Sequence, residues 1–205
     1  MGNRISPDYA TPHSPQPLTG APAVLWLTGI SGAGKTTIAS HLKQLCLASG
    51  HAAAMLDGDE LRGRLNADLG FSESDRAENV RRIAEVAALM ADAGLLVIVS
   101  CISPLASFRL AARDIVGAQR FVEVYIDTPI DVAEARDPKG LYRLARAGKI
   151  TGFTGLHAAY EPPREPAIRI DTTVTGVEAA AERLLGHYQA MARAAATRAE
   201  AGVCG

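Results

Sequence analysis

A glycine-rich loop between an apolar run and a lysine constrains this chain most. Residues 24–28, "VLWLT", lead directly into "GISGAGKTT", which satisfies the pattern G-x-x-x-x-G-K-[ST]. The glycines let backbone N–H groups converge on an anion at a helix N-terminus. The lysine charge suits the β- and γ-phosphates of a nucleotide, and the threonine hydroxyl suits Mg²⁺. The pattern therefore predicts a strand, a phosphate-binding loop and a helix, with an ordinary glycine-rich turn as the alternative.

This loop predicts ATP and Mg²⁺ as the cofactors. The residues predicted to bind ATP lie in one continuous stretch: Gly29, Ile30, Ser31, Gly32, Ala33, Gly34, Lys35, Thr36 and Thr37. Within it, Lys35 is also predicted to be catalytic and Thr36 to ligate Mg²⁺. A GTP-dependent switch would need an Asn-Lys-x-Asp motif to read guanine, and the sequence contains none.

Apolar runs alternate with helical patterns along the chain, which predicts an α/β fold. Strands are expected at 24–28, 53–56, 95–99, 121–126 and 168–170. Helices are expected at 35–49, 75–93, 104–116, from about 130 onward and at 177–200. We expect the three-layer P-loop NTPase architecture, a mostly parallel five-stranded sheet with helices on both faces and a lid.

The length of 205 residues fits one domain, assigned to 23–200 between short tails. Residues 1–22, rich in Pro and Ser/Thr, are expected to be a disordered tail, and 201–205 a C-terminal tail. The start "MGNRIS" fits a myristoylation pattern, but no polybasic cluster follows it, so lipidation is not expected. Residues 137–166, rich in Gly, Pro and basic side chains, fit the alternation poorly and are interpreted as the lid.

Charge and cysteine content exclude several classes of partner. Lys and Arg number 21 and Asp and Glu 22, so a net charge of −1 does not indicate a nucleic-acid or membrane-surface protein. No apolar run reaches the roughly 20 residues needed to cross a bilayer. Cys46, Cys101 and Cys204 are scattered and odd in number, which favours neither a disulfide framework nor a zinc site. A reducing cytoplasm is the expected location.

Two carboxylates follow the second expected strand, in the tripeptide Asp57-Gly58-Asp59. In a doubly wound sheet the carboxyl ends of the strands line the ligand crevice. Asp57 and Asp59 are therefore candidates to orient an attacking hydroxyl, to accept its proton or to hold the water shell of the metal. A turn with solvated aspartates is the alternative.

Residues 68–82, "DLGFSESDRAENVRR", suggest an anionic acceptor. Arg76 and Asn79 lie three apart on a helix and share a face, and Arg62 precedes them closely. Arginine pairs with phosphate or sulfate oxygens through its planar fork, and Phe71 offers an aromatic face for stacking. The alternative is a charged helix surface.

A basic stripe is expected farther along the chain. Arg136, Lys139, Arg143 and Arg146 fall at offsets 0, 3, 7 and 10, which places them on one side of a continuous helix. Such a stripe could close over transferring phosphates and stabilise the charge of the transition state. A solvated basic face is the alternative.

Taken together, these segments resemble the adenylyl-sulfate kinase family. The resemblance covers roughly residues 23–172 in order and rests on "GISGAGKTT", "LDGDELR", "DLGFSESDRAENVRRI", "ISP", "DTPIDVAEARDPKGLYRLARAGKITGFTG" and "YEPP". The phosphate loop is common to many proteins, whereas the third and fifth segments are far more specific. Such enzymes transfer the γ-phosphate of ATP to the ribose 3′-hydroxyl of adenylyl sulfate (APS), giving 3′-phosphoadenylyl sulfate (PAPS) and ADP in sulfate activation.

The resemblance also implies roles for individual residues. By match, the residues holding the sulfated nucleotide are Arg62, Arg76, Asn79 and Lys139, and those clamping its adenine are Phe71 and Phe153. Asp57 and Asp59 would lie beside the hydroxyl, Ile102 and Ser103 would line the site, and Arg136 would contact ATP. The family's counterpart of Ser103 is often described as a phosphoserine intermediate. We favour direct in-line transfer, because positioning and charge stabilisation suffice for it.

One departure from the family pattern concerns the residues after "ISP". The family usually continues with Tyr-Arg, whereas this chain has Leu105-Ala106, so an arginine near the acceptor is missing. Either Arg109, one helical turn on, substitutes for it, or the affinity for APS is weaker. The resemblance further implies a homodimer and a functional association with ATP sulfurylase.

Two other functions compete with this interpretation. A kinase for another small acceptor, such as a sugar acid or a nucleoside, would use the same phosphate loop, but the arginines and the aromatic pair favour an anionic nucleotide. A non-catalytic, kinase-like regulatory domain would be expected to lose phosphate-loop residues, whereas Lys35, Thr36 and both aspartates are present.

Overall fold

The computed structural model describes residues 23–203, and side chains up to residue 198. Its five strands are all parallel, in the order β2-β3-β1-β4-β5. Their bounds are β1 Val24–Thr28, β2 Ala53–Asp57, β3 Leu96–Ser100, β4 Phe121–Asp127 and β5 Ile168–Asp171. The expected three-layer α/β fold is confirmed, with strand boundaries within one residue of those predicted. The predicted N-terminal tail and the myristoylation pattern lie outside the described residues.

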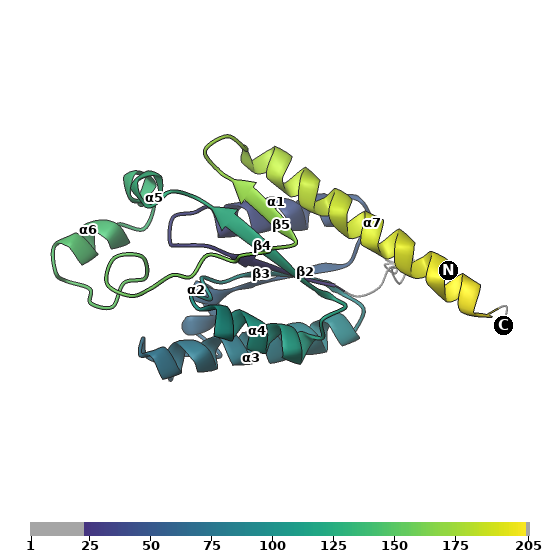
Figure 1. Cartoon of the computed structure of the whole chain (residues 1–205), viewed down its shortest axis with the longest axis horizontal. Coiled ribbons are helices and arrows are strands. Elements are labelled where there is room, and N and C mark those ends of the chain that lie inside the picture. The colour runs from purple at the N-terminus through teal and green to yellow at the C-terminus, as the bar shows by residue number, and fades with distance from the viewer. Residues whose placement is uncertain (1–22, 204–205) are drawn as a thin grey trace, which may run out of the picture.

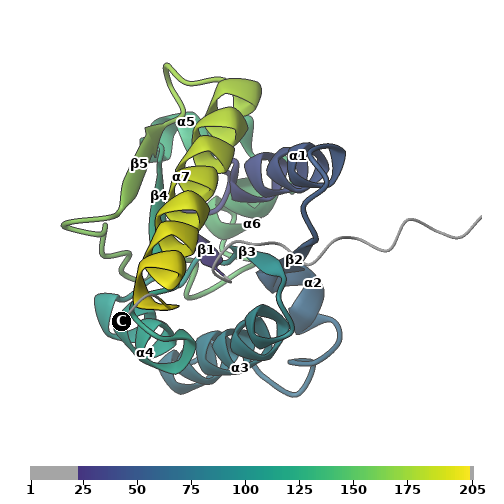
Figure 2. The same ribbon diagram turned by 90° about the vertical axis from the view of Figure 1, so that its right-hand side faces the viewer.

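Helices cover both faces of the sheet. Helices α1 (Lys35–Ala48) and α7 (Val177–Val203) lie on one face, and α3 (Glu73–Asp92) and α4 (Ala106–Val116) on the other (Figures 1 and 2). Alternate residues of β1 divide between two cores: Leu25 and Leu27 pack with α1 and α7, and Val24 and Trp26 with α3 and α4. Both faces of β1 are thus buried, as its continuous apolar run predicts.

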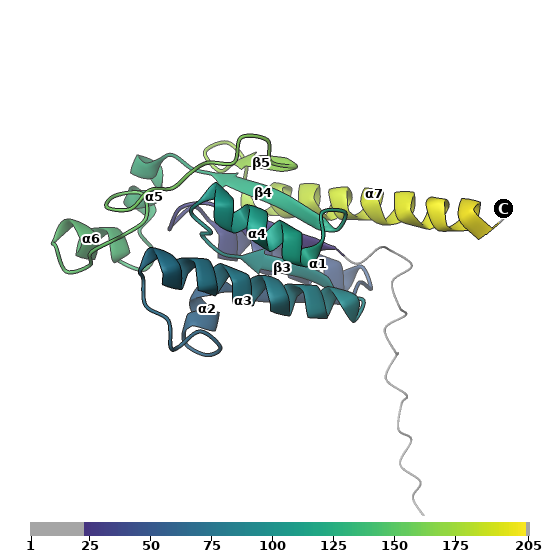
Figure 3. The same cartoon turned by 60° about the horizontal axis from the view of Figure 1, so that its bottom comes forward.

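Helix boundaries follow the capping residues. Helix α3 begins two residues before the predicted start, because Ser72 accepts from the Asp75 backbone N–H and forms a capping box with Asp75. Helix α4 begins two residues later than predicted, at Ala106, with Leu105 as its N-cap and Pro104 outside the helix. Helix α7 continues to Val203, past the predicted end of the domain at residue 200, and its C-terminal part projects beyond the sheet (Figure 3).

Three short helices lie near the end of the molecule opposite the C-terminus of α7: α2 (Gly58–Arg62), α5 (Ile130–Arg136) and α6 (Leu141–Arg146) (Figures 1 and 3). Sequence patterns did not predict α2, which is too short to show helical periodicity, and they placed residues 136–146, including α6, on a single helix. None of the helices within residues 23–203 is long and apolar enough to cross a bilayer.

Parallel pairing brings polar strand ends to one edge of the sheet. Asp57 at the end of β2 is in register with Ser100 at the end of β3, and Ser100 is in register with Leu27 of β1. Each strand is followed by a segment that starts from this carboxyl edge, which is where ligands bind in open α/β sheets.

Candidate active site

The phosphate loop lies between β1 and α1, with its backbone packed tightly against neighbouring elements. A Cβ atom on Gly32 would lie 2.8 Å from the Ala133 carbonyl oxygen of α5, and one on Gly29 would lie 2.6 Å from the Ile126 carbonyl oxygen of β4. Gly32 also has φ +74°, which L side chains rarely adopt. These two positions therefore require glycine. Gly34, the N-cap of α1, provides no side-chain cap, so the first N–H groups of this helix are not satisfied by a capping side chain and suit a phosphate.

Lys35 points back into this loop. Its buried ammonium group donates to the carbonyl oxygens of Gly29 and Ile30, both at 2.8 Å. Burial lowers the Lys35 pKa to about 8, although the nearby Cys101, Asp59 and Asp57 oppose the shift. An anion in the loop would favour the charged form, so this lysine suits a polyphosphate.

Oxygen ligands gather beside the loop at the carboxyl edge. The Thr36 hydroxyl donates to Asp57 Oδ2 at 2.8 Å and lies 3.2 Å from the Ser100 hydroxyl. The second Asp57 oxygen accepts from the Asp59 and Glu60 backbone N–H groups and so caps α2. Ser100 was missed from the sequence, although its place as the polar end of an otherwise apolar strand was a usable signal.

These hydroxyl and carboxylate oxygens fit Mg²⁺, which prefers oxygen ligands and keeps several waters. In the described part of the chain, no three His, Cys, Asp or Glu side chains group to hold a metal. A magnesium ion here would therefore rely on nucleotide phosphates and water for most of its ligands, with Thr36 and Asp57 beside them.

Asp59 contacts the segment predicted to be the lid. Its carboxylate accepts from the Lys139 ammonium group across 80 residues of sequence, and this pairing raises the pKa of Lys139. Two of the residues predicted to be catalytic thus meet at the mouth of the phosphate loop.

A second lid contact reaches the loop itself. The Tyr142 hydroxyl of α6 donates to the Ser31 carbonyl oxygen at 2.9 Å, and the Tyr142 ring is buried. Sequence reasoning missed Tyr142, because an aromatic residue between basic ones carries no pattern of its own.

The arginines predicted to bind the acceptor surround Phe71. The Arg62 guanidinium lies 4.6 Å from the centre of the Phe71 ring and that of Arg76 lies 5.7 Å from it. Phe71 is 67% exposed, an unusual exposure for a phenylalanine in a folded domain. An exposed ring between two arginines is suited to stack on a base and to hold an anionic group.

Arg76 also joins the two segments that carry the predicted aromatic clamp. Its guanidinium donates to the Phe71 carbonyl oxygen at 2.9 Å, to Thr154 Oγ1 at 2.8 Å and to the Gly152 carbonyl oxygen at 2.7 Å. Phe153 lies between the last two residues, but its ring is only 8% exposed and packs edge-on against Tyr142. The structure therefore places one clamp residue on the surface and buries the other.

The remaining predicted acceptor residues are more deeply placed. Asn79 is buried, accepts from Asn66 Nδ2 at 3.0 Å and lies 3.9 Å from Cys101 Sγ. The Ile102 carbonyl oxygen accepts from Thr28 Oγ1 at 2.7 Å. Ser103 is 1% exposed, with φ +38°, and its hydroxyl accepts from Trp26 Nε1 at 3.0 Å. The Ser103 oxygen is thus already engaged within the core.

The predicted basic stripe is wrong as a single helical face. Helix α5 ends at Arg136, Asp137 and Gly140 both have positive φ, and α6 begins only at Leu141. The four side chains consequently diverge: Lys139 pairs with Asp59, Arg146 pairs with Glu134, and Arg143 lies on α6.

Arg136 turns toward the loop that follows β5. It donates to the Thr172 hydroxyl and carbonyl oxygens at 3.0 and 2.9 Å. Thr172 in turn contacts Thr128 at 2.6 Å, and Thr128 donates to the Ala33 carbonyl oxygen of the phosphate loop at 3.2 Å. Arg136 is therefore linked to the predicted ATP site through two threonines.

Arg109 does not take the place of the missing arginine. It is 4% exposed and donates to Glu123 at 2.6 Å, to the Ser103 carbonyl oxygen at 2.9 Å and to the Glu161 carbonyl oxygen at 2.9 Å. Each of the three guanidinium nitrogens is therefore already bonded within the fold. Arg109 also lines a groove of about 890 Å³ between α4 and residues 160–167, and no residue predicted to bind either substrate lines that groove.

Comparisons with known proteins identify the family of this chain. The family model described as Adenylylsulphate kinase matches residues 21–171. The adenylyl-sulfate kinase of Pseudomonas aeruginosa is 49% identical over 82% of this chain and 86% of its own length. The bifunctional enzyme NodQ of Rhizobium meliloti is 54% identical over 74% of this chain but only 24% of its own length.

A solved structure gives the same result. The Mycobacterium tuberculosis APS kinase CysC, solved in complex with AMPPNP and APS, superposes with a TM-score of 0.78 at 46% identity, covering 82% of this chain and 97% of that one. The chain belongs to the adenylylsulphate kinase family of P-loop kinases.

Proposed function

We propose that this protein uses ATP to phosphorylate the ribose 3′-hydroxyl of APS, producing PAPS and ADP. The observation that carries the proposal is the meeting of two sites at one sheet edge. A phosphate loop with Lys35 and Thr36 lies on one side, and the Arg62–Phe71–Arg76 group on the other. The ion pair of Lys139 with Asp59 joins the predicted lid to this edge.

On the donor side, residues 29–37 bind the polyphosphate of ATP. Backbone N–H groups at the start of α1 and the Lys35 ammonium group take the phosphate oxygens. Arg136 contacts the nucleotide from the end of α5, a role that its link through Thr172 and Thr128 to Ala33 supports. Thr36, with Asp57 beside it, would hold Mg²⁺, which would neutralise charge on the β- and γ-phosphates when bound.

On the acceptor side, arginines and aromatic rings bind APS. Arg62 and Arg76 take the anionic phosphosulfate, Phe71 stacks on the adenine, and Phe153 forms the other wall after moving away from Tyr142. Asn79, Ile102 and Ser103 form the floor of this pocket, consistent with the burial of Asn79 and Ser103.

Phosphoryl transfer is direct. The 3′-oxygen forms a bond to the γ-phosphorus while the bond from that phosphorus to the β,γ-bridging oxygen breaks, and ADP leaves with that electron pair. Asp59 accepts the hydroxyl proton, since both Asp57 oxygens are already bonded to Thr36 and the α2 N-terminus. Lys139 stabilises the charge that develops on the transferring group.

A phosphoserine at Ser103 is not part of this mechanism. The hydroxyl is buried and bonded to Trp26, so it would have to leave the core to meet the γ-phosphate. A buried hydrogen bond of this kind costs about 1–3 kcal/mol to break without replacement. Direct transfer needs no such movement.

Location and partners extend the proposal. Cys46 and Cys101 are free and buried, which favours a reducing compartment such as the cytoplasm. NodQ, in which the matching region is about a quarter of a bifunctional enzyme, supports action beside a second activity, and we propose that this is ATP sulfurylase. We retain the homodimer as part of the proposal.

The test is an ADP-release assay with ATP and Mg²⁺ against a panel of acceptors. The panel contains APS, AMP, gluconate and shikimate, the last two being acceptors of other small kinases on this fold. ADP release with APS, together with PAPS detected by mass spectrometry, is the expected result. Faster release with gluconate, shikimate or AMP than with APS would overturn the proposal.

A further inference from the structure

The segment between α2 and α3 carries part of the acceptor site but has little apolar support. We call residues 63–72 the acceptor loop. Asn66 is its one buried residue. Leu65 and Phe71 are 47% and 67% exposed, and Leu69 is half-buried without belonging to either core cluster. Hydrophobic burial therefore contributes little to the conformation of this loop. Its position must depend on polar contacts.

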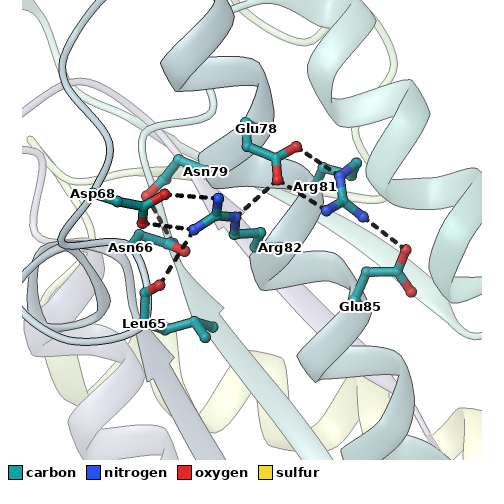
Figure 4. Close-up of polar contacts among 8 residues, drawn as sticks. All are labelled: Leu65, Asn66, Asp68, Glu78, Asn79, Arg81, Arg82 and Glu85. Atoms are coloured by element: carbon teal, nitrogen blue, oxygen red, sulfur yellow. Dashed lines mark hydrogen bonds and ion pairs between the residues drawn. The ribbon is translucent and has the colours of Figure 1, made fainter.

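Arg82 of α3 supplies the strongest of these contacts. Its guanidinium forms a bidentate pair with Asp68, donating to the two carboxylate oxygens at 2.7 and 2.9 Å (Figure 4). It also donates to the Leu65 carbonyl oxygen at 3.4 Å. A bidentate arginine–carboxylate pair fixes orientation as well as distance. Arg82 thus holds the acceptor loop at two points, 14 and 17 residues away in sequence.

The third donor of Arg82 is fixed to its own helix. Arg82 Nε donates to Glu78 Oε1 at 2.8 Å, and Glu78 also accepts twice from Arg81, at 2.7 and 2.9 Å (Figure 4). Arg81 and Arg82 together lower the pKa of Glu78 to about 2, so this carboxylate stays charged at neutral pH. The Arg82 side chain is therefore oriented by Glu78 before it reaches the loop.

Between Leu65 and Asp68, the two residues that Arg82 contacts, the loop forms a hydrogen bond to the acceptor site. Asn66 lies between Leu65 and Asp68, and its buried side chain donates to Asn79 Oδ1 at 3.0 Å. Farther along the same loop, the Gly70 and Phe71 carbonyl oxygens accept from Arg62 and Arg76. The loop conformation that Arg82 fixes is thus the one that presents Phe71 and contacts Asn79.

We propose that Arg82 is a positioning residue for APS, which acts by clamping Asp68 and so keeping the acceptor loop in its binding conformation. The inference rests on the proposed function and adds a residue to it that touches neither substrate. Exposed ion pairs contribute little to global stability, so the effect is confined to the loop. If loss of the clamp leaves about a tenth of the molecules with the loop in place, the apparent affinity for APS falls about tenfold.

The experiment compares Arg82→Ala with Arg81→Ala. Arg81 is the matched control, because it neighbours Arg82 on α3 and shares Glu78, but its own bonds go to Glu78 and Glu85 rather than to the loop. We expect Arg82→Ala to raise KM for APS about tenfold and KM for ATP less than threefold. Arg81→Ala should change neither by more than twofold. Arg82→Lys, which keeps the charge but not the fork, should recover only part of the loss.

A second measurement needs no substrate. Amide hydrogen exchange over residues 63–72 of the ligand-free protein should speed up several-fold in Arg82→Ala and stay unchanged in Arg81→Ala. Asp68→Asn breaks the same fork from an exposed position, so it gives the same comparison if Arg82→Ala fails to fold.

The outcomes separate the two proposals. Two results would overturn the role of Arg82. One is the same amide exchange rate over residues 63–72 in Arg81→Ala and Arg82→Ala. The other is an equal rise in KM for APS and KM for ATP in Arg82→Ala. A wild-type protein that releases no ADP with APS would overturn the proposed function instead, and the exchange comparison would still decide whether the clamp exists.

Discussion

The phosphate loop and the acceptor loop lie at the same edge of the sheet, yet they are held in different ways. In the phosphate loop, glycines bring the backbone against the carbonyl oxygens of Ile126 and Ala133, where no side chain would fit. The acceptor loop is bonded by three arginines. Arg62 and Arg76 donate to its carbonyl oxygens, and Arg82 binds both oxygens of Asp68.

This difference suggests how the two sites divide their tasks. Close backbone packing leaves the phosphate loop few alternative conformations, which suits a donor common to all P-loop kinases. Arginine contacts can be broken and remade at modest cost, so we propose that the acceptor loop and the predicted lid open for APS and close over it. We therefore expect substitutions on the donor side to abolish transfer and those on the acceptor side to change substrate affinity.

The largest effect is expected from Lys35→Ala. The change removes the ammonium group that fills the phosphate loop, and kcat should fall about 10³-fold or more in the ADP-release assay. Lys43→Ala, about two turns along the same helix, is the control and should keep its activity. Near-normal turnover of Lys35→Ala would show that the loop does not bind the transferring phosphate.

Asp59→Asn comes next, because it removes the proposed proton acceptor and weakens the pairing with Lys139. We expect kcat to fall about 10²-fold with KM for ATP within threefold of the wild-type value. Steady-state kinetics with both substrates varied would measure this. If KM for ATP rose while kcat was retained, Asp59 would be a nucleotide-binding residue instead.

Arg76→Ala should separate the acceptor from the donor. Its loss frees Phe71 and disconnects Gly152 and Thr154 from α3, so KM for APS should rise about 30-fold. KM for ATP should change less than threefold, and the effect should exceed that of Arg82→Ala. A larger change in KM for ATP than in KM for APS would show that Arg76 belongs to the donor site and not to the acceptor site.

Ser103→Ala should have the smallest effect on transfer. Turnover is expected within about threefold of the wild-type value, while the unpaired Trp26 N–H lowers the free energy of unfolding by about 1–3 kcal/mol. Chemical denaturation measures the second quantity. A loss of turnover above 10²-fold, with phosphate found on Ser103 by mass spectrometry after incubation with ATP, would restore the phosphoserine intermediate.

Much of the fold could be predicted from the sequence, because buried parallel strands are continuous apolar runs that glycine and polar residues end. Strands β1 and β3 follow this rule along their whole length, whereas the edge strands β2 and β5 are only partly buried. The long helices were predicted from their periodicity instead. The lid did not, since Asp137 and Gly140 adopt positive φ and interrupt a spacing that looked helical. Local backbone conformation of this kind leaves no periodic signal.

The site was predictable where a motif carried it and less so elsewhere. The contacts of Lys35, Thr36 and Asp57 agree with the phosphate-loop pattern. The burial and bonding of Arg109 could not be predicted, because its partners Glu123 and Glu161 come from distant segments that only the fold brings together. Tyr142 was missed because no local pattern marks it, whereas Ser100, the polar end of an apolar strand, carried a signal that was not used.

The most direct test of two adjoining sites is a crystal structure with a non-hydrolysable ATP analogue and APS bound together. The account predicts the polyphosphate along residues 29–37, the adenine of APS against Phe71, and the 3′-hydroxyl closest to Asp59. A sulfated nucleotide bound away from Phe71 and Arg76 would contradict it.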